Sequence, residues 1–184
     1  MKRHGKPALI LLLMGTLLFG AVYPLIVWSV AHLFFPFKAE GSKVFLNEKC
    51  VGLHFVGQTF VQEKYFWARP SWSYRVRDRL ISGGSNLSWS SPLLRASVES
   101  KSRAWRQLGR DLPEDLVMAS ASGCDPEISL NAALIQVPRI ARARGLSEEE
   151  VMALVRESEE PSFGKLFPKR VNVLRVNVEL DGYF

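Results

Sequence analysis

The sequence predicts a single N-terminal transmembrane helix followed by one mixed α/β extracytoplasmic domain. Two observations support this fold class. No Asp, Glu, Lys or Arg occurs between Pro7 and Phe37, whereas charged residues are frequent from Lys38 onward. Helix and strand patterns then alternate in the polar remainder of the chain. The 184 residues are enough for one domain and an anchor.

Residues 8–35 are long enough to cross a bilayer as a helix. At ~1.5 Å per residue they would extend about 42 Å, against ~30 Å of hydrocarbon. A cleaved signal peptide also begins with basic residues and an apolar run, but its apolar region is only ~7–15 residues long. Here apolarity continues well past Gly20-Ala21, the one plausible cleavage site. The sequence therefore favours an uncleaved anchor.

The basic residues that precede the anchor set its expected orientation. Cationic flanks stay preferentially in the cytoplasm, although Lys38 and Lys43 on the far side oppose that assignment. A folded domain follows these two lysines. The predicted organisation is a cytoplasmic basic N-terminus (1–7, with Lys2, Arg3 and Lys6), a transmembrane helix (8–35) and an extracytoplasmic domain (38–184).

Small residues and a proline give the anchor a packing face. Pro24 is expected to kink the helix, and a neighbouring helix would cover the backbone that it leaves unpaired. Gly15, Thr16 and Gly20 offer a small-residue surface for close helix contact. The alternative is that glycine is simply common in membrane helices. Because one helix cannot enclose an ion path, we expect a subunit and not a solitary pore.

The first part of the extracytoplasmic region is predicted to hold few regular elements. Residues 51–60 are rich in β-branched and aromatic residues and predict a strand and a turn. A loop-rich tract that is crowded with aromatic residues follows from Tyr65 to Pro92. Ser91-Pro92 is typical of a helix start, and that helix is expected to end near Leu108. The aromatic residues of the tract include Trp67, Trp72, Tyr74 and Trp89.

The C-terminal part carries stronger helix signals. Ser129 is expected to cap a helix that runs to Arg144, bends at Pro138 and closes at Gly145. Ser147 with Glu150 predicts a capping box for the next helix, to about residue 157. Two strands are predicted around these helices: a short one at 116–120, before a turn at Asp125-Pro126, and a terminal one at 171–180 with a bulge near Leu174.

Composition offers little enzymatic or nucleic-acid chemistry. Half of the net charge of +6 comes from the three basic residues of the N-terminus, which argues against a basic nucleic-acid-binding face. The three histidines are scattered, and we expect no metal site, no catalytic residues and no bound cofactor. His54, alone in the extracytoplasmic region, is expected to be structural. Cys50 and Cys124 can pair in an oxidising compartment or remain free, and the sequence leaves both open.

The stretch Ser82-Gly83-Gly84-Ser85-Asn86 has two interpretations. Paired glycines can cradle a phosphate with backbone N–H groups, as in nucleotide-binding loops. They can equally form a surface turn, tied by side-chain to backbone bonds of Ser85 and Asn86 and held by Trp89 on the core or on a partner.

Five stretches in this order and spacing resemble the C subunit of the bacterial Kdp potassium-transporting ATPase. They cover nearly the whole chain: AVYPLIVWSVAHLFFPFKAEGS (21–42), VGQTFVQEKYFWARPS (56–71), SGGSNL (82–87), ASASGCDPEISLNAALIQVPRIARARGL (119–146) and RVNVLRVNVELD (170–181). Cys124 departs from the family pattern, which usually has an apolar residue there.

The resemblance implies a non-catalytic accessory subunit of an inner-membrane complex that takes up potassium with high affinity. Its partners would be a potassium-selective channel-like chain, a P-type ATPase chain that hydrolyses ATP, a very small peptide and the lipid bilayer. The family member is described as needed for assembly and as a catalytic chaperone that raises the ATPase chain's affinity for ATP. In that account the Gly-Gly tract resembles a signature loop of ABC-type ATPases, and a glutamine matching Gln136 contacts the nucleotide.

The predicted orientation opposes a direct nucleotide contact. With a cytoplasmic N-terminus, Gly83, Gly84 and Gln136 lie across ~30 Å of hydrocarbon from cellular ATP. Gln136 is also expected mid-helix, where a hydrogen bond to backbone freed by Pro138 would be natural. Arg139, with Arg142 and Arg144, forms either a solvated charged face or a docking face for an acidic partner surface.

Three hypotheses follow: an accessory subunit, a nucleotide-sensing subunit, or a stand-alone membrane-anchored extracytoplasmic protein. The first is favoured. The second requires a cytoplasmic domain, and the third requires a catalytic constellation that the sequence does not display.

Overall fold

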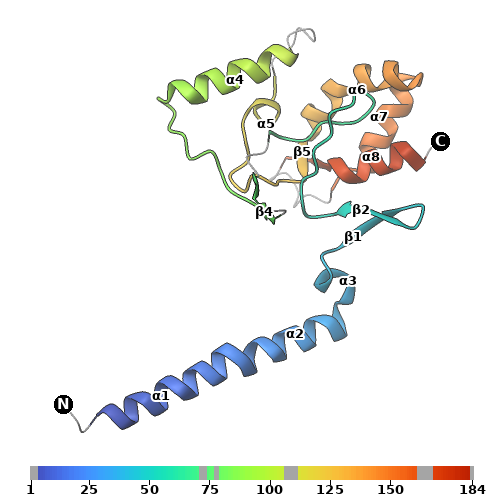
Figure 1. Ribbon diagram of the computed structural model, residues 1–184. Helices are drawn as coiled ribbons and strands as arrows, with labels where there is room; N and C mark the ends of the chain where they lie inside the picture. Colours follow the sequence, from blue (N-terminus) through green and yellow to red (C-terminus); the bar gives the residue numbers. More distant parts are fainter. Residues whose placement is uncertain (1–3, 71–73, 77–78, 106–111, 161–167, 183–184) are drawn as a thin grey trace. The chain divides into compact units, whose positions relative to one another are not determined.

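The chain divides into two compact units, residues 1–43 and 44–184. The computed structural model describes residues 4–70, 74–76, 79–105, 112–160 and 168–182, coloured by sequence in Figure 1. One N-terminal apolar helix, long enough to span a membrane, is followed by a mixed α/β region.

The first unit is dominated by one continuous helix from Gly5 to Phe34. It consists of α1 (Gly5–Leu17), the π-helical segment η1 (Leu18–Val22) and α2 (Tyr23–Phe34). Its 30 residues are long and apolar enough to cross a membrane, and none of its most apolar window is buried within the chain. The helix thus begins three residues before the predicted span of 8–35 and ends one residue before the end of that span. It stops at Phe34 because Phe35 precedes Pro36, and the residue before a proline disfavours helical backbone.

Pro24 perturbs the helix in a specific way. Proline has no N–H to donate, and its ring collides with the carbonyl four residues earlier in a regular α-helix. The π-helical segment η1 lies directly before it and widens the turn that would otherwise clash. After the helix, the one-turn α3 (Pro36–Ala39) ends in a tight reversal in which the Ser42 N–H donates to the Phe37 carbonyl at 2.9 Å.

The second unit contains three two-stranded sheets and five helices among its described residues. The β1–β2 connection is a two-residue hairpin turn whose residues, Asn47 and Glu48, both have positive φ (48° and 64°), as a type I′ turn requires. The β3–β4 and β5–β6 pairs are antiparallel. The strands are β1 (Lys43–Leu46), β2 (Lys49–Leu53), β3 (Tyr74–Val76), β4 (Arg79–Ile81), β5 (Glu127–Ser129) and β6 (Arg170–Asn172), and the helices are α4 (Pro92–Trp105), α5 (Glu114–Val117), α6 (Leu130–Arg144), α7 (Glu148–Glu157) and α8 (Val173–Gly182).

The core lies where α6, α7 and α8 meet the β5–β6 pair, the region drawn in orange and red in Figure 1. Burial of apolar side chains of this size stabilises each by about 1.5–3 kcal/mol relative to exposure. Phe66, from the irregular segment before β3, is also fully buried there. The completely buried aliphatic residues include Ile128, Ile140, Val151, Val155, Val171, Val176 and Leu180.

Several local predictions are confirmed. Helix α4 begins at Pro92 as expected, although residues 106–108 of its predicted end lie outside the described residues. Helix α6 is capped by Ser129, whose hydroxyl accepts from the Ala132 N–H at 3.1 Å, and closes at Gly145 with φ of 70°. Helix α7 carries the predicted capping box of Ser147 and Glu150.

Both predicted strands near the C-terminal core are wrong or too long. Instead of a strand at 116–120, α5 makes a helical turn, which Pro113 precedes and which carries Glu114 and Asp115 in its first turn, where acidic residues favour helix. The strand predicted at 171–180 is short β6 followed by α8. Its buried residues Val173, Leu174, Val176, Asn177 and Leu180 follow helical spacing, which outweighs the β-propensity of valine.

The strand and turn predicted at 51–60 are only partly observed. Strand β2 begins at Lys49 and ends at Leu53, and the rest of that stretch is turn and irregular backbone. Strand β1 was not predicted. The loop-rich tract from residue 65 to 92 is largely irregular but contains the β3–β4 pair, and Trp72 lies outside the described residues.

Candidate functional site

Two side-chain amides hold the backbone of consecutive residues, Phe66 and Trp67. Asn177 of α8 accepts from the Phe66 N–H at 2.8 Å and donates to its carbonyl at 3.0 Å. Gln136 of α6 does the same for Trp67, at 2.8 and 3.1 Å. Each amide therefore pairs with both the N–H and the carbonyl of one residue, as the backbone of a neighbouring β-strand would. Because Gln136 and Asn177 are 0% and 1% exposed, these bonds form in the interior, where an unpaired backbone group is costly.

The amide of Gln136 has no capacity left for a ligand. Its oxygen accepts from Trp67 and, at 2.8 Å, from the Arg139 guanidinium, and its nitrogen also donates to the Ala132 carbonyl at 3.2 Å. A side-chain amide offers two acceptor and two donor positions, and all four are occupied. The expectation that Gln136 bonds to backbone freed by Pro138 misses the partner, since that carbonyl belongs to Leu134.

Arg139 is turned inward and packs on Trp67. Its guanidinium carbon lies 4.0 Å from the centre of the indole ring, a cation–π geometry, and it donates to the carbonyls of Tyr65, at 2.9 Å, and Glu63. Burial lowers the pKa of Arg139 to about 10, with the Glu63 charge opposing the shift, so the group stays protonated at neutral pH. A solvated arginine face is therefore wrong for this residue.

Arg144 also points inward, next to the C-terminal helix. It pairs with Asp181 at 2.7 Å and donates to the carbonyls of Lys64, at 2.8 Å, and Leu180, at 3.1 Å. Its side chain is only 7% exposed. Of the three arginines that predicted a charged face, only Arg142 is exposed.

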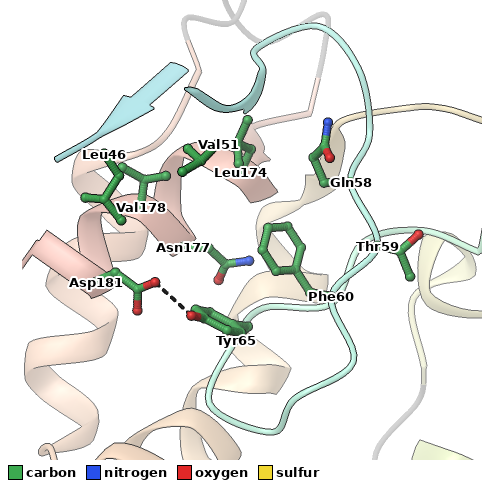
Figure 2. A pocket seen from close by; sticks show the side chains of 10 residues that line it. All are labelled: Leu46, Val51, Gln58, Thr59, Phe60, Tyr65, Leu174, Asn177, Val178 and Asp181. Carbon is green, nitrogen blue, oxygen red and sulfur yellow. Dashed lines mark hydrogen bonds between the residues drawn. The ribbon is translucent and has the colours of Figure 1, made fainter. Parts of the chain in front are cut away.

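Asp181 closes this network. Burial raises the pKa of its carboxyl, but hydrogen bonds from Arg144 and Tyr65 and the nearby positive charges outweigh burial, so the pKa is lowered overall. The Tyr65 hydroxyl donates to Asp181 at 2.8 Å, the dashed line in Figure 2. The carboxylate thus fixes the 60–67 segment on the C-terminal half of the unit.

A cleft of about 320 Å³ lies beside this pair, between the β1–β2 hairpin and α8 (Figure 2). Its wall mixes aliphatic, aromatic and amide side chains with the Tyr65–Asp181 pair. Among the described residues, no group of three or more His, Cys, Asp or Glu could hold a metal ion. The cleft is lined by Leu46, Val51, Gln58, Thr59, Phe60, Tyr65, Leu174, Asn177, Val178 and Asp181.

The Gly-Gly loop packs on a second loop at residues 121–123. A Cβ at Gly123, which has φ of 69°, would collide with the Gly83 carbonyl oxygen, and one at Gly84 would lie 3.1 Å from the Ala121 carbonyl oxygen. A Cβ at Gly83 meets nothing within 4 Å. Gly84 and Gly123 therefore permit close backbone contact between two loops. Asn86 also takes a left-handed backbone, with φ of 51°.

The polar fringe of this loop faces outward. Ser82 and Asn86 are exposed and Ser85 is half-buried. Trp89, expected to hold the loop on the core or on a partner, is 81% exposed, so it does not pack on the core. Of the predicted site residues, the structure thus brings Gln136 and Arg139 into contact. Gly83 and Gly84 instead lie against the 121–123 loop.

The small residues of the N-terminal helix open a shallow apolar groove. Thr16 and Gly20 are adjacent, since the Thr16 methyl lies 3.9 Å from where a Cβ on Gly20 would be. A groove of about 420 Å³ runs beside Gly15, lined by Leu11, Met14, Gly15, Leu17, Leu18, Phe19 and Val22. Close helix packing needs such a surface.

The two cysteines and His54 were the other residues singled out from the sequence. Cys50 and Cys124 are both free. The His54 ring lies 3.7 Å from a Glu160 carboxyl oxygen, and the His54 carbonyl accepts from Asn172 at 2.8 Å. His54 thus connects the segment after β2 to the segment around β6.

Sequence reasoning missed Trp67 and Asn177 as partners of Gln136 and Arg139. Trp67 was only one of several aromatic residues in an irregular tract, and Asn177 was one polar position in a valine-rich run. The available signal was a polar residue at a position that helical spacing assigns to the core of α8. Such a residue must find an internal partner.

Comparison with known proteins identifies the class of protein to which this chain belongs. The family of potassium-pump chains described as "K+-transporting ATPase, c chain" matches residues 5–182. The chain therefore belongs to the KdpC family.

Several relatives carry the name "Potassium-transporting ATPase KdpC subunit". The protein from Methylibium petroleiphilum is 45% identical and covers 99% of this chain and 98% of its own length. The protein from Janthinobacterium sp. (strain Marseille) is 41% identical, with 98% and 99% covered. That from Geotalea uraniireducens is 42% identical, with 96% of each chain covered.

Proposed function

We propose that this chain is a non-catalytic accessory subunit of an ATP-driven, high-affinity potassium uptake complex in the bacterial inner membrane. The observation that carries the proposal is the Gly5–Phe34 helix, which is long and apolar and buries none of its most apolar window within its own chain. Apolar surface of this extent needs lipid or another helix around it. The family membership supplies the kind of complex to which the helix belongs.

In this proposal the anchor packs against helices of the partner chains. The small residues Gly15, Thr16 and Gly20 allow a partner helix to approach closely. A partner side chain can fill the groove beside Gly15. Pro24 cannot donate a hydrogen bond to the helix backbone before it, and a neighbouring helix would shield this stretch of backbone from lipid. The partners are the channel-like chain, the ATP-hydrolysing chain and the small peptide.

The orientation proposed is N-terminus in and residues 38–184 outside. Three basic residues stand within the first seven positions, and the positive-inside rule keeps them in the cytoplasm. On the other side, Lys43 pairs with Glu40 at 2.9 Å, which reduces its weight as a retained charge. ATP would then be bound and hydrolysed on the opposite side of the membrane from the folded unit.

Direct ATP contact is the weaker alternative. A nucleotide-binding Gln136 would have to leave four internal hydrogen bonds and full burial, and Arg139 would have to leave the face of Trp67. We therefore assign Gln136 and Arg139 an architectural role and Ser82 to Asn86 a role in loop packing or subunit contact. Any effect of this chain on the ATP affinity of the ATPase chain would be transmitted through the complex.

Co-purification tests this function. An affinity tag at the C-terminus should recover the channel-like and ATP-hydrolysing chains from detergent-solubilised membranes. A variant in which residues 1–37 are replaced by a cleavable export signal should recover neither. The proposal fails if the full-length chain recovers neither partner, and the anchor argument fails if the truncated variant recovers both in full.

A further inference from the structure

A second groove, of about 360 Å³, lies in the 44–184 unit between α4 and the segment 60–70. All of its lining residues but one are apolar. Trp105 and Leu116 form its buried floor, whereas Val61 at the groove is 78% exposed. The Trp67 indole N–H donates to the Gln62 carbonyl at 3.0 Å and so needs no ligand. The lining residues are Phe60, Val61, Trp67, Ala68, Pro70, Lys101, Ala104, Trp105 and Leu116.

Among the described residues that line this groove, Lys101 is the one that carries a charge. Its side chain is half-buried on α4, and it has no hydrogen-bond or ion-pair partner among the described residues. Burial lowers the pKa of Lys101, and no described carboxylate offsets the cost of removing water from this ammonium. A half-buried cation without a partner, at the edge of an apolar groove, is complementary to an anion attached to an apolar group.

The other charges of α4, which include Arg95, are exposed. Arg103 pairs with Glu99 at 2.8 Å, and both side chains are well exposed. In a helix, residues 99 and 103 lie on the face opposite residues 101 and 105. Lys101 is thus the half-buried charge of α4, on the groove side, and Arg103 on the opposite side provides a matched control.

We propose that this groove binds a segment of a partner chain that places an apolar side chain over Trp105 and Leu116 and an Asp or Glu carboxylate on the Lys101 ammonium. The volume suits one or two large side chains, not a folded element. The carboxylate supplies a counter-charge that none of the described residues gives Lys101, so apolar burial and the ion pair favour the same occupant. This inference rests on the proposed function, because it requires that the chain works within a complex.

Site-specific photo-crosslinking in cells tests the identity of the occupant. A benzoylphenylalanine residue at Val61, at the groove, should form an adduct with another protein chain, whereas the same residue at Glu99, on the opposite face, should not. Mass spectrometry should place the adduct within about three residues of an Asp or Glu. Adducts with lipid alone, no adduct, or an adduct on a segment without carboxylates would overturn the proposal.

Charge reversal tests the role of Lys101 in the full complex. Lys101→Glu should lower the yield of co-purified partner chains by about tenfold, Lys101→Met by less, and Arg103→Glu by less than twofold. Circular dichroism of each purified variant shows that it has folded. If Lys101→Glu recovers the partners as well as wild type does, this inference fails and the proposed function stands. If the wild-type chain itself recovers no partner, both fail.

Discussion

Removal of the Gln136 side-chain amide separates an architectural role from a nucleotide-binding role. In Gln136→Ala, the Trp67 N–H and carbonyl lose partners at 2.8 and 3.1 Å, and Arg139 loses one hydrogen bond. An unpaired buried backbone group costs about 1–3 kcal/mol. Because Trp67 is only half-buried, water can reach part of this site, and the expected loss in free energy of unfolding is about 3 kcal/mol.

The assay is thermal or denaturant unfolding of the full chain in detergent, followed by near-ultraviolet circular dichroism. For a chain of this size, about 3 kcal/mol corresponds to a fall in Tm of roughly 6–12 °C. The matched control is Gln62→Ala, because Gln62 is exposed and, among the described residues, its side chain has no hydrogen-bond partner. That control should change the stability by less than ~0.5 kcal/mol.

A nucleotide contact predicts the reverse pattern. Gln136→Ala would then leave the stability of the chain unchanged and weaken ATP binding by the assembled complex. Such a result would refute the architectural role assigned to Gln136. Gln136→Glu refines the test, since a carboxylate can still accept from Trp67 and Arg139 but can no longer donate to carbonyls, and an intermediate loss of stability is expected.

Three further changes probe other parts of the account. The pKa of Asp181 is lower in the folded chain, so its pairing with Arg144 stabilises the fold at pH values above the ordinary pKa of 3.8. This stabilisation is lost as the pH falls through the pKa of the folded state. Asp181→Asn should remove this acid dependence from a pH series of unfolding curves. Gly123→Ala, forced into the Gly83 carbonyl at a positive φ, should destabilise the chain by about 1–3 kcal/mol, whereas Gly83→Ala should be nearly neutral by the same measurement. Gly20→Leu should reduce co-purification of partner chains with an unchanged Tm, and unchanged recovery would contradict the packing role of this face.

Elements with local signals could be predicted from the sequence. The apolar run fixed the N-terminal helix to within three residues at either end, because length and apolarity are read directly from composition. Helices α6 and α7 were predicted because Ser129, Gly145 and the Ser147–Glu150 box act over at most four residues.

Elements that depend on distant contacts could not be predicted. The valines of 171–180 favour a strand locally, yet burial at helical spacing decides for α8. Gln136 bonds to a residue 69 positions away and Asn177 to one 111 positions away. Likewise, nothing in the sequence around Arg139 or Arg144 indicates that each would turn inward onto Trp67 or Asp181.

The side of the membrane on which the 44–184 unit lies tests the central claim most directly. Cys50 is exposed, so a membrane-impermeant maleimide can report its location in a Cys124→Ser background. A His4→Cys variant without the native cysteines reports the opposite end of the anchor. With the 44–184 unit outside, the reagent should label Cys50 in intact spheroplasts and should label position 4 only after lysis. Labelling of position 4 alone before lysis would contradict this orientation and return the folded unit to the side where ATP is found.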